Sequence, residues 1–371
     1  MIYIHIPFCG SFCTYCDFYS EVAGGRSYDS FVSSLCREIE AGKENIDKET
    51  NTLYIGGGTP SVLPLSAFYA IRELLGRDFS EYTVEVNPED IVTKGRDYVR
   101  GLLDAGVNRV SMGVQSFDDG MLKWMNRRHD SGAALEAYDI LRDAGVGNIS
   151  IDLIFGIAHL DDSLWRRTVA KALALKPQHI SAYQLSVEPE SVLAGMVRSG
   201  KYSEAEESQC RRQYDILCSM LSDAGYRHYE ISNFSIPGYE AKHNSAYWRH
   251  VPYRGFGPGA HSLDIVDGKY VRSWNIPDLK KYIAYYGTGD LSDIRQSEKL
   301  TPEQIAIEKI MLGLRTDGGV SHSILDKVSG IVRLETLLKK GMLVPVPGNP
   351  SFFRIPENCF FISDNIIADL I

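Results

Sequence analysis

Three cysteines stand close together near the start of the chain, at Cys9, Cys13 and Cys16, in the run FCGSFCTYCDF. Thiolates at this C-x3-C-x2-C spacing can hold zinc or an iron–sulfur cluster. Structural zinc normally takes four protein ligands from two knuckles, and the other cysteines stand alone, at Cys36, Cys210, Cys218 and Cys359. A four-iron cluster on three cysteines keeps one iron open for a ligand. The pattern therefore favours a [4Fe–4S] cluster, with a zinc-stabilised protein as the alternative.

Other residues suited to ligand binding follow the ends of later hydrophobic runs. The segment IGGGTPS carries Gly57, Gly58 and Thr59, and glycine-rich backbone can approach a ligand closely and offer its amide groups. A buried acid is costly unless it is paired, and an arginine can pair with a ligand carboxylate. Each such residue could equally belong to a structural ion pair or hydrogen bond. The polar candidates are Glu85, Gln115 and Asp152, on or just after the runs, and Arg127 in the later segment NRRHD.

The hydrophobic pattern around these residues predicts strands that alternate with helices. Amphipathic stretches such as Ser66 to Leu75 and Tyr98 to Ala105 follow the runs. Repeated strand–helix units predict a parallel sheet, whose carboxyl ends carry the chemistry-bearing loops. The six predicted strands are Ile2 to Ile6, Thr52 to Ile55, Tyr82 to Val86, Arg109 to Val114, Ile149 to Ile154 and His179 to Leu185.

The regular alternation of predicted strands and helices ends after the sixth unit. A long charged helix is expected from about Ser203 to Ala224, and a loop-rich aromatic stretch from Tyr226 to about Trp274. Because no two further units complete an eight-unit barrel, we predict an α/β fold with a partial, three-quarter TIM-like barrel of six units. This domain covers 1–275, and a small, mainly helical C-terminal domain at 300–371 contains the hairpin-like run VPVPGNPSFFRI.

Composition limits the class of protein. The chain has 371 residues, 44% of them hydrophobic, and a formal net charge of −9, which argues against general nucleic-acid binding. No segment reaches the roughly 18 apolar residues of a membrane helix. Three of the seven cysteines cluster at one end and the number is odd, unlike a disulfide framework, which indicates a reducing compartment. Because the cluster begins at Cys9, we expect no cleavable signal ahead of it. We therefore expect a cytoplasmic protein.

The cysteine motif, with an aromatic residue (Tyr15) before the third cysteine, resembles the radical S-adenosylmethionine (radical SAM) superfamily. The resemblance implies that the open iron binds the amino and carboxylate groups of SAM, and that reductive cleavage yields methionine and a 5′-deoxyadenosyl radical. The later segments resemble, in order, the coproporphyrinogen oxidase-like branch, although IAHLD after Gly156 departs from the usual Pro-Gly-Gln-Thr turn. The implied SAM-binding residues are Tyr3, Tyr15, Gly57, Gly58, Thr59, Glu85, Gln115, Arg127 and Asp152.

Two features separate the oxidases of that branch from its heme chaperones of the HemW type. The oxidases carry a further cysteine two residues after the third, where this chain has Phe18, which cannot act as a thiol. The run HNSAYW matches the chaperones' H-N-x-x-Y-W motif, which implies heme contacts by His243, Tyr247 and Trp248, and His261 is a secondary candidate.

The resemblance thus predicts a chaperone that binds heme and transfers it to heme-requiring apoproteins. The alternative is SAM-dependent oxidative decarboxylation of coproporphyrinogen III. Whether SAM is cleaved in normal function stays open.

Overall fold

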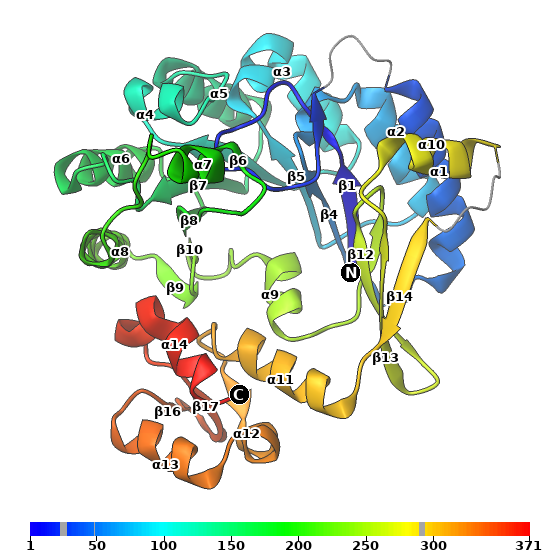
Figure 1. The fold of residues 1–371 in the computed structure, drawn as a ribbon. Coiled ribbons are helices and arrows are strands. Elements are labelled where there is room, and N and C mark those ends of the chain that lie inside the picture. Colours follow the sequence, from blue (N-terminus) through cyan, green and yellow to red (C-terminus); the bar gives the residue numbers. More distant parts are fainter. Residues whose placement is uncertain (23–27, 48, 289–293) are drawn as a thin grey trace.

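A curved nine-stranded sheet forms the centre of the computed structural model, which describes residues 1–22, 28–47, 49–288 and 294–371 (Figure 1). Six parallel strands run through it in chain order and confirm the predicted units, with every strand end within two residues of its predicted place. They are β1 (Ile2–Ile6), β4 (Thr52–Gly57), β5 (Glu81–Val86), β6 (Arg109–Gln115), β7 (Ile149–Phe155) and β8 (His179–Gln184).

Helices surround the outside of this sheet (Figure 1). Several begin at a side-chain cap; Asp130 and Asp161, for example, each accept a backbone N–H of the first turn. The predicted helix from Tyr98 is only the second half of its element, because the helix already begins at Pro88 and is kinked at Gly95. The helices of this layer are α1 (Asp29–Gly42), α2 (Leu65–Leu75), α3 (Pro88–Asp104), α4 (Asp119–Trp124), α5 (Ser131–Ala144), α6 (Asp162–Ala174) and α8 (Glu207–Asp223). The short helix α7 (Val192–Arg198) instead contacts the N-terminal loop, where Leu193 N–H donates to the Thr14 carbonyl.

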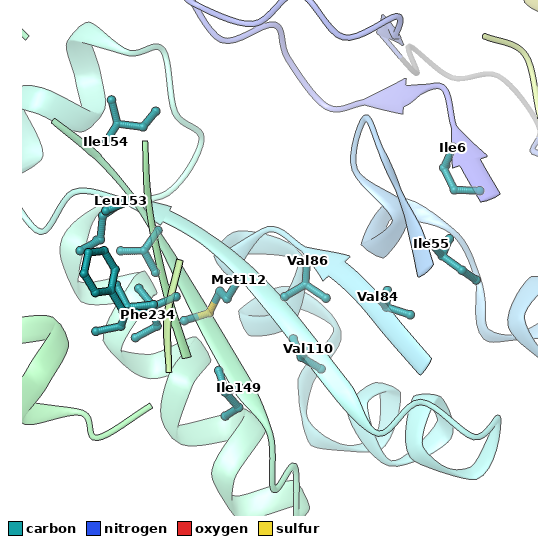
Figure 2. Packing of buried hydrophobic residues seen from close by; sticks show 14 of the residues in the cluster. Ile6, Ile55, Val84, Val86, Val110, Met112, Ile149, Leu153, Ile154 and Phe234 are labelled. Carbon is teal, nitrogen blue, oxygen red and sulfur yellow. The ribbon is translucent and has the colours of Figure 1, made fainter. Parts of the chain in front are cut away.

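The parallel strands are apolar on the face toward the helices and polar on the face toward the barrel interior. Val84, Val110, Met112 and Ile149 belong to one buried hydrophobic cluster (Figure 2). Because side chains of a strand alternate between its faces, the residues between these point the other way. The barrel interior therefore receives a row of polar side chains, among them Glu85, Ser111, Asp152 and Ser181.

The stretch from Tyr226 to Trp274 is not loop-rich, so this expectation was wrong. Its strand β11 (Arg254–Phe256) pairs in parallel with β1 and adds a seventh parallel strand. At the other edge, β10 (Asn233–Ser235) pairs antiparallel with β8 and with β9 (Arg227–Glu230). These strands have only three or four residues, too few to show a period in the sequence. The stretch also contains α9 (Lys242–Trp248), β12 (His261–Val266) and β13 (Lys269–Asn275).

The C-terminal unit packs below the β9 edge of the sheet (Figure 1). Backbone hydrogen bonds from Ile231 to Arg315 and from Asp317 to Tyr229 join it to that edge. The predicted hairpin is present, as β16 (Val344–Val346) and β17 (Asn349–Arg354). The other elements are β15 (Val320–Ser321), α11 (Pro302–Gly313), α12 (His322–Val328), α13 (Ile331–Lys339), the 3-10 helix η3 (Glu357–Ile362) and α14 (Ser363–Ala368).

The remaining elements complete the N-terminal part and the link between the two units. A short pair, β2 (Phe8–Cys9) and β3 (Glu21–Val22), follows β1, and α10 (Leu279–Thr288) packs on α1. Strand β14 (Arg295–Lys299) pairs with β13 and so lies between the two predicted domain ranges. Within the described residues, no helix is long and apolar enough to cross a membrane.

A buried carboxylate ties the N-terminal helix to the later part of the chain. Glu38 on α1 accepts hydrogen bonds from the Gly257 backbone N–H (2.7 Å), the Asn275 amide (2.7 Å) and the Tyr282 hydroxyl (2.6 Å). Burial raises the pKa of Glu38, while these three hydrogen bonds oppose the rise. The three donors come from elements more than 200 residues away in the sequence, so this contact closes the β11 edge of the barrel.

We expect Glu38→Ala to lower the free energy of unfolding by at least ~3 kcal/mol, because it leaves three buried donors without an acceptor. Glu40→Ala, on the same helix but with an exposed side chain, should change it by less than ~0.5 kcal/mol. Urea unfolding of both variants measures the difference. Equal effects would contradict this role of Glu38.

Candidate functional site

A cavity of about 480 Å³ opens at the carboxyl ends of the parallel strands and extends into the barrel. Parallel strands present their carboxyl ends at one edge, which is why residues far apart in the sequence meet there. All three clustered cysteines line the cavity. Eight of the nine predicted SAM-binding residues line it as well: Tyr15, Gly57, Gly58, Thr59, Glu85, Gln115, Arg127 and Asp152.

The three cysteines lie on β2 and the loop that follows it. All are half-buried free thiols, and burial raises the pKa of Cys16 to about 11. The loop is fixed at both sides: the Asn126 amide donates to the Phe12 carbonyl (2.7 Å), and Leu193 N–H donates to the Thr14 carbonyl (2.7 Å). The thiols are thus held at the cavity by the rest of the barrel, which suits thiolate ligation of a metal cluster.

The glycine loop after β4 packs directly beneath the cysteine loop. Gly58 N–H donates to the Ile6 carbonyl (2.8 Å) and Thr59 N–H to the Phe8 carbonyl (2.7 Å). A Cβ on Gly58 would lie 2.6 Å from the Phe8 carbonyl oxygen, so this close approach requires glycine. Gly57, at φ +107°, uses its own N–H for Glu85.

The amide groups of this loop do not face the cavity as donors, contrary to the prediction from its glycines. The three amide groups expected to face a ligand are engaged within the protein. An ammonium group, being a donor, would need acceptors such as the carbonyl oxygens of this loop.

Two acidic side chains lie inside the barrel near the glycine loop. Glu85 accepts from the Tyr54 hydroxyl (2.6 Å) and from Gly57 N–H (3.2 Å), and Asp152 accepts from Ser111 (3.2 Å). Burial raises the pKa of Glu85 to about 7 despite the hydrogen bond from Tyr54, and the nearby charge of Asp152 adds to the rise. Burial also raises the pKa of Asp152. Among the described residues the charge of Arg109 lowers the pKa of both carboxylates without overcoming the effect of burial, so a cationic or hydroxyl-bearing ligand would stabilise both further.

Arg127 and Gln115 present unsatisfied polar atoms at the cavity. Arg127 donates to the Cys13 thiol (3.3 Å) and to the Gly113 carbonyl (2.5 Å), yet its Nε is buried without a partner among the described residues. The Gln115 Oε1 is buried and unpartnered in the same part of the chain, and its backbone adopts the left-handed conformation at φ +67°. Strain of this kind in a non-glycine residue concentrates at ligand sites. Together they offer a cation, which fits the carboxylate of an amino-acid moiety, and an acceptor for a polar hydrogen of the ligand.

Two aromatic candidates have different positions. Tyr3 lies beside the cavity rather than in its lining, with its hydroxyl hydrogen-bonded to His5 (2.9 Å). Phe18 lines the mouth and is 65% exposed. Its position therefore leaves the three cysteines without a fourth thiol at the mouth.

The predicted heme-contacting residues lie at the opposite end of the barrel. Glu81, the first residue of β5, accepts backbone N–H groups of Lys242 and His243 (both 2.8 Å) and so holds the start of α9. The His243 ring is buried, with Nδ1 against the Thr52 hydroxyl (3.0 Å) and Nε2 against the Tyr247 hydroxyl (3.3 Å). Burial lowers the pKa of His243 to about 3.

Both His243 nitrogens are therefore occupied in this conformation, and one hydrogen bond must open before the ring can ligate a metal. Trp248 is half-buried at the end of α9. Asn244, the residue after His243, lines the cavity. The secondary candidate His261 lies at the surface, stacked on Trp274. The heme assignment stays a prediction.

Sequence reasoning missed several residues of the cavity lining. Tyr54, Arg109, Ser111 and Tyr183 all contribute to it. All four fall on strands that were correctly predicted, and the last three lie two residues from another lining residue of the same strand. Period-two alternation counted back from Gln115 would have found Ser111 and Arg109.

Comparison with known proteins assigns the family. The model of the Radical SAM superfamily matches residues 3–172. The heme chaperone HemW of Bacillus subtilis is 34% identical over 326 residues, 86% of this chain and 84% of the relative, and that of Lactococcus lactis is 36% identical over 324 residues, 86% and 82%. A solved structure of coproporphyrinogen III oxidase (HemN) from Escherichia coli, 22% identical, superposes with a TM-score of 0.79 over 100% of this chain and 89% of that one, which confirms the fold. The chain belongs to the HemW family of the radical SAM superfamily.

Proposed function

We propose that this protein is a heme chaperone that carries a [4Fe–4S] cluster and SAM, binds heme and transfers it to heme-requiring apoproteins. The observation that carries the proposal is the cavity at the carboxyl ends of the strands, where Cys9, Cys13 and Cys16 meet the polar interior of the barrel and Phe18 stands where the oxidases have another cysteine. The similarity to curated heme chaperones over 86% of the chain supports the same function. Cytoplasmic location is part of the proposal.

In this proposal the three cysteines ligate the cluster and leave one iron for SAM. Arg127 would hold the SAM carboxylate, and the carbonyl oxygens of Gly57 and Gly58 would accept from its ammonium. Glu85 and Asp152, with Tyr15, Thr59 and Gln115 around them, would contact the remaining polar groups, and Tyr3 would support the interior from beside the cavity. When bound, the cluster and SAM supply electron transfer and a carbon radical precursor.

For heme, we infer that His243 is the ligand within a contact surface that includes Tyr247 and Trp248. Imidazole is the commonest protein ligand of heme iron, and aromatic rings pack well on a porphyrin. The Tyr247 hydroxyl, which lies 3.3 Å from His243 Nε2, is the group that would have to move.

The cluster assignment predicts the outcome of single cysteine replacements. Anaerobically reconstituted protein should hold about four irons per chain and show the broad visible absorption of a [4Fe–4S] cluster. Cys9→Ala, Cys13→Ala and Cys16→Ala should each lose most of the iron, because a cluster with two thiolates is poorly held. Cys36→Ala, on α1, is the control. Colourless protein with one zinc per chain would support the zinc alternative instead.

The Glu85 assignment predicts a pH dependence of SAM binding. The pKa of this carboxyl is about 7 in the ligand-free protein, and donors on SAM would favour its ionised form, so affinity should rise as the pH increases through about 7 and then level off. Glu85→Gln should weaken binding about 10- to 100-fold, as for loss of a charge-assisted hydrogen bond, and flatten the pH profile.

Calorimetry on cluster-loaded protein measures both effects. Glu73→Gln, an exposed carboxyl on α2, is the control. An unchanged pH slope in Glu85→Gln would contradict a contact between Glu85 and SAM.

The heme assignment predicts that only one of two variants of α9 weakens heme binding. Heme titration should produce a Soret band that is strongly weakened by His243→Gln. Tyr247→Phe removes the hydrogen bond to Nε2 and should keep or strengthen heme binding. His322→Gln, on the C-terminal unit, is the control. A Soret band unaffected by His243→Gln would place the heme ligand elsewhere.

A turnover assay on the cluster-loaded protein distinguishes the chaperone proposal from the oxidase alternative. Incubated anaerobically with SAM, a reductant and coproporphyrinogen III, it should form no vinyl product. Formation of protoporphyrinogen would overturn the chaperone proposal in favour of the enzyme.

A further inference from the structure

A second group of metal-ligating side chains lies away from the cavity described above. Cys218 on α8, His228 on β9 and Glu357 at the start of η3 bring their ligand atoms within 4.8 Å of one another. His228 Nδ1 lies 3.0 Å from a Glu357 carboxylate oxygen and 3.9 Å from the Cys218 sulfur. Tetrahedral zinc with bonds of about 2.0–2.3 Å separates its ligand atoms by roughly 3.3–3.8 Å, so small side-chain shifts would suffice.

The imidazole is already oriented as a metal-bound histidine would be. Its side chain is 3% exposed, stacks on Phe234 with ring centroids 4.0 Å apart, and meets the edge of Phe360. Nε2, the nitrogen away from Cys218 and Glu357, lies 3.4 Å from the Tyr214 hydroxyl and 3.5 Å from the Ile231 carbonyl. Metal-ligating histidines usually donate their second N–H to such an oxygen, which fixes the ring.

The three ligands border a cavity of about 300 Å³ between α8, β9 and the C-terminal unit. An ion held by them would therefore keep an open position toward the cavity. Charge also balances: a thiolate and a carboxylate together neutralise a divalent cation, and the thiol proton is released on binding. Arg354 lines the same cavity and attracts Glu357, so it competes with a bound cation for that carboxylate. Arg227 also lines the cavity, but its charge is paired with Asp317.

We propose that Cys218, His228 and Glu357 form a binding site for a borderline divalent transition metal, with Zn²⁺ as the best match to a mixed S, N, O ligand set. Because the ligands come from α8, β9 and η3, the ion would clamp the C-terminal unit to the edge of the barrel. The site is independent of the cluster and of heme.

The experiment uses the full chain with its [4Fe–4S] cluster reconstituted, so that the N-terminal thiols are occupied. Calorimetric titration with Zn²⁺ should show one site, and Co²⁺ should give the visible bands of a tetrahedral thiolate complex. Cys218→Ser should abolish those bands. Glu357→Gln, a change at a largely exposed side chain, should weaken Zn²⁺ binding about tenfold or more.

Two further variants sharpen the test. Arg354→Gln removes the competing cation and should tighten Zn²⁺ binding, which a merely structural His228–Glu357 contact does not predict. Cys36→Ser is the matched thiol control and should bind as the unaltered chain does. Absence of Zn²⁺ binding, or binding unchanged in both Cys218→Ser and Glu357→Gln, would overturn the proposal.

Discussion

The parallel pairing of β4 to β8, with one register shift between Gly113 and Gln115 of β6, is the constraint on which the rest of the structure depends. It places Glu85 beside Ser111, and Asp152 beside Ser181, on neighbouring strands. Because side chains alternate faces, a slip by one residue in any strand would send a polar residue into the helix layer and an apolar one into the barrel. The hydrophobic cluster against the helices prevents such a slip, and so it also fixes the geometry of the polar interior.

The polar barrel interior lowers the stability of the ligand-free protein, but its unsatisfied groups suit ligand binding. Glu85 and Asp152 share a confined space, and their raised pKa values express the cost of charging them there. Gln115 is strained and, among the described residues, leaves its amide oxygen without a partner. Local losses of stability of this kind are typical of binding sites, because a ligand that satisfies the groups recovers the energy.

The molecule separates its reactive groups in space. The three cysteines lie at the carboxyl ends of the strands, whereas α9 with His243 is held at the amino end of β5 through Glu81. The cavity between them extends as far as Asn244 on the same helix. The C-terminal unit adds a third location, where His228 of the sheet edge meets Glu357. Communication between these places would have to pass through the barrel interior or its edge strands.

The sequence alone determined the six parallel units and the cysteine motif, and it indicated eight polar or glycine residues that line the cavity with the cysteines, because strand periodicity and motif spacing are local properties of the chain. Residues at predicted strand ends, such as Glu85 and Asp152, could be placed together because parallel strands share one edge. Tertiary structure alone decided three matters: that β11 extends the sheet beside β1, that both nitrogens of His243 are engaged, and that Cys218, His228 and Glu357 meet. Each depends on contacts between segments distant in the chain, and the packing that produces such contacts leaves no periodic trace in the sequence.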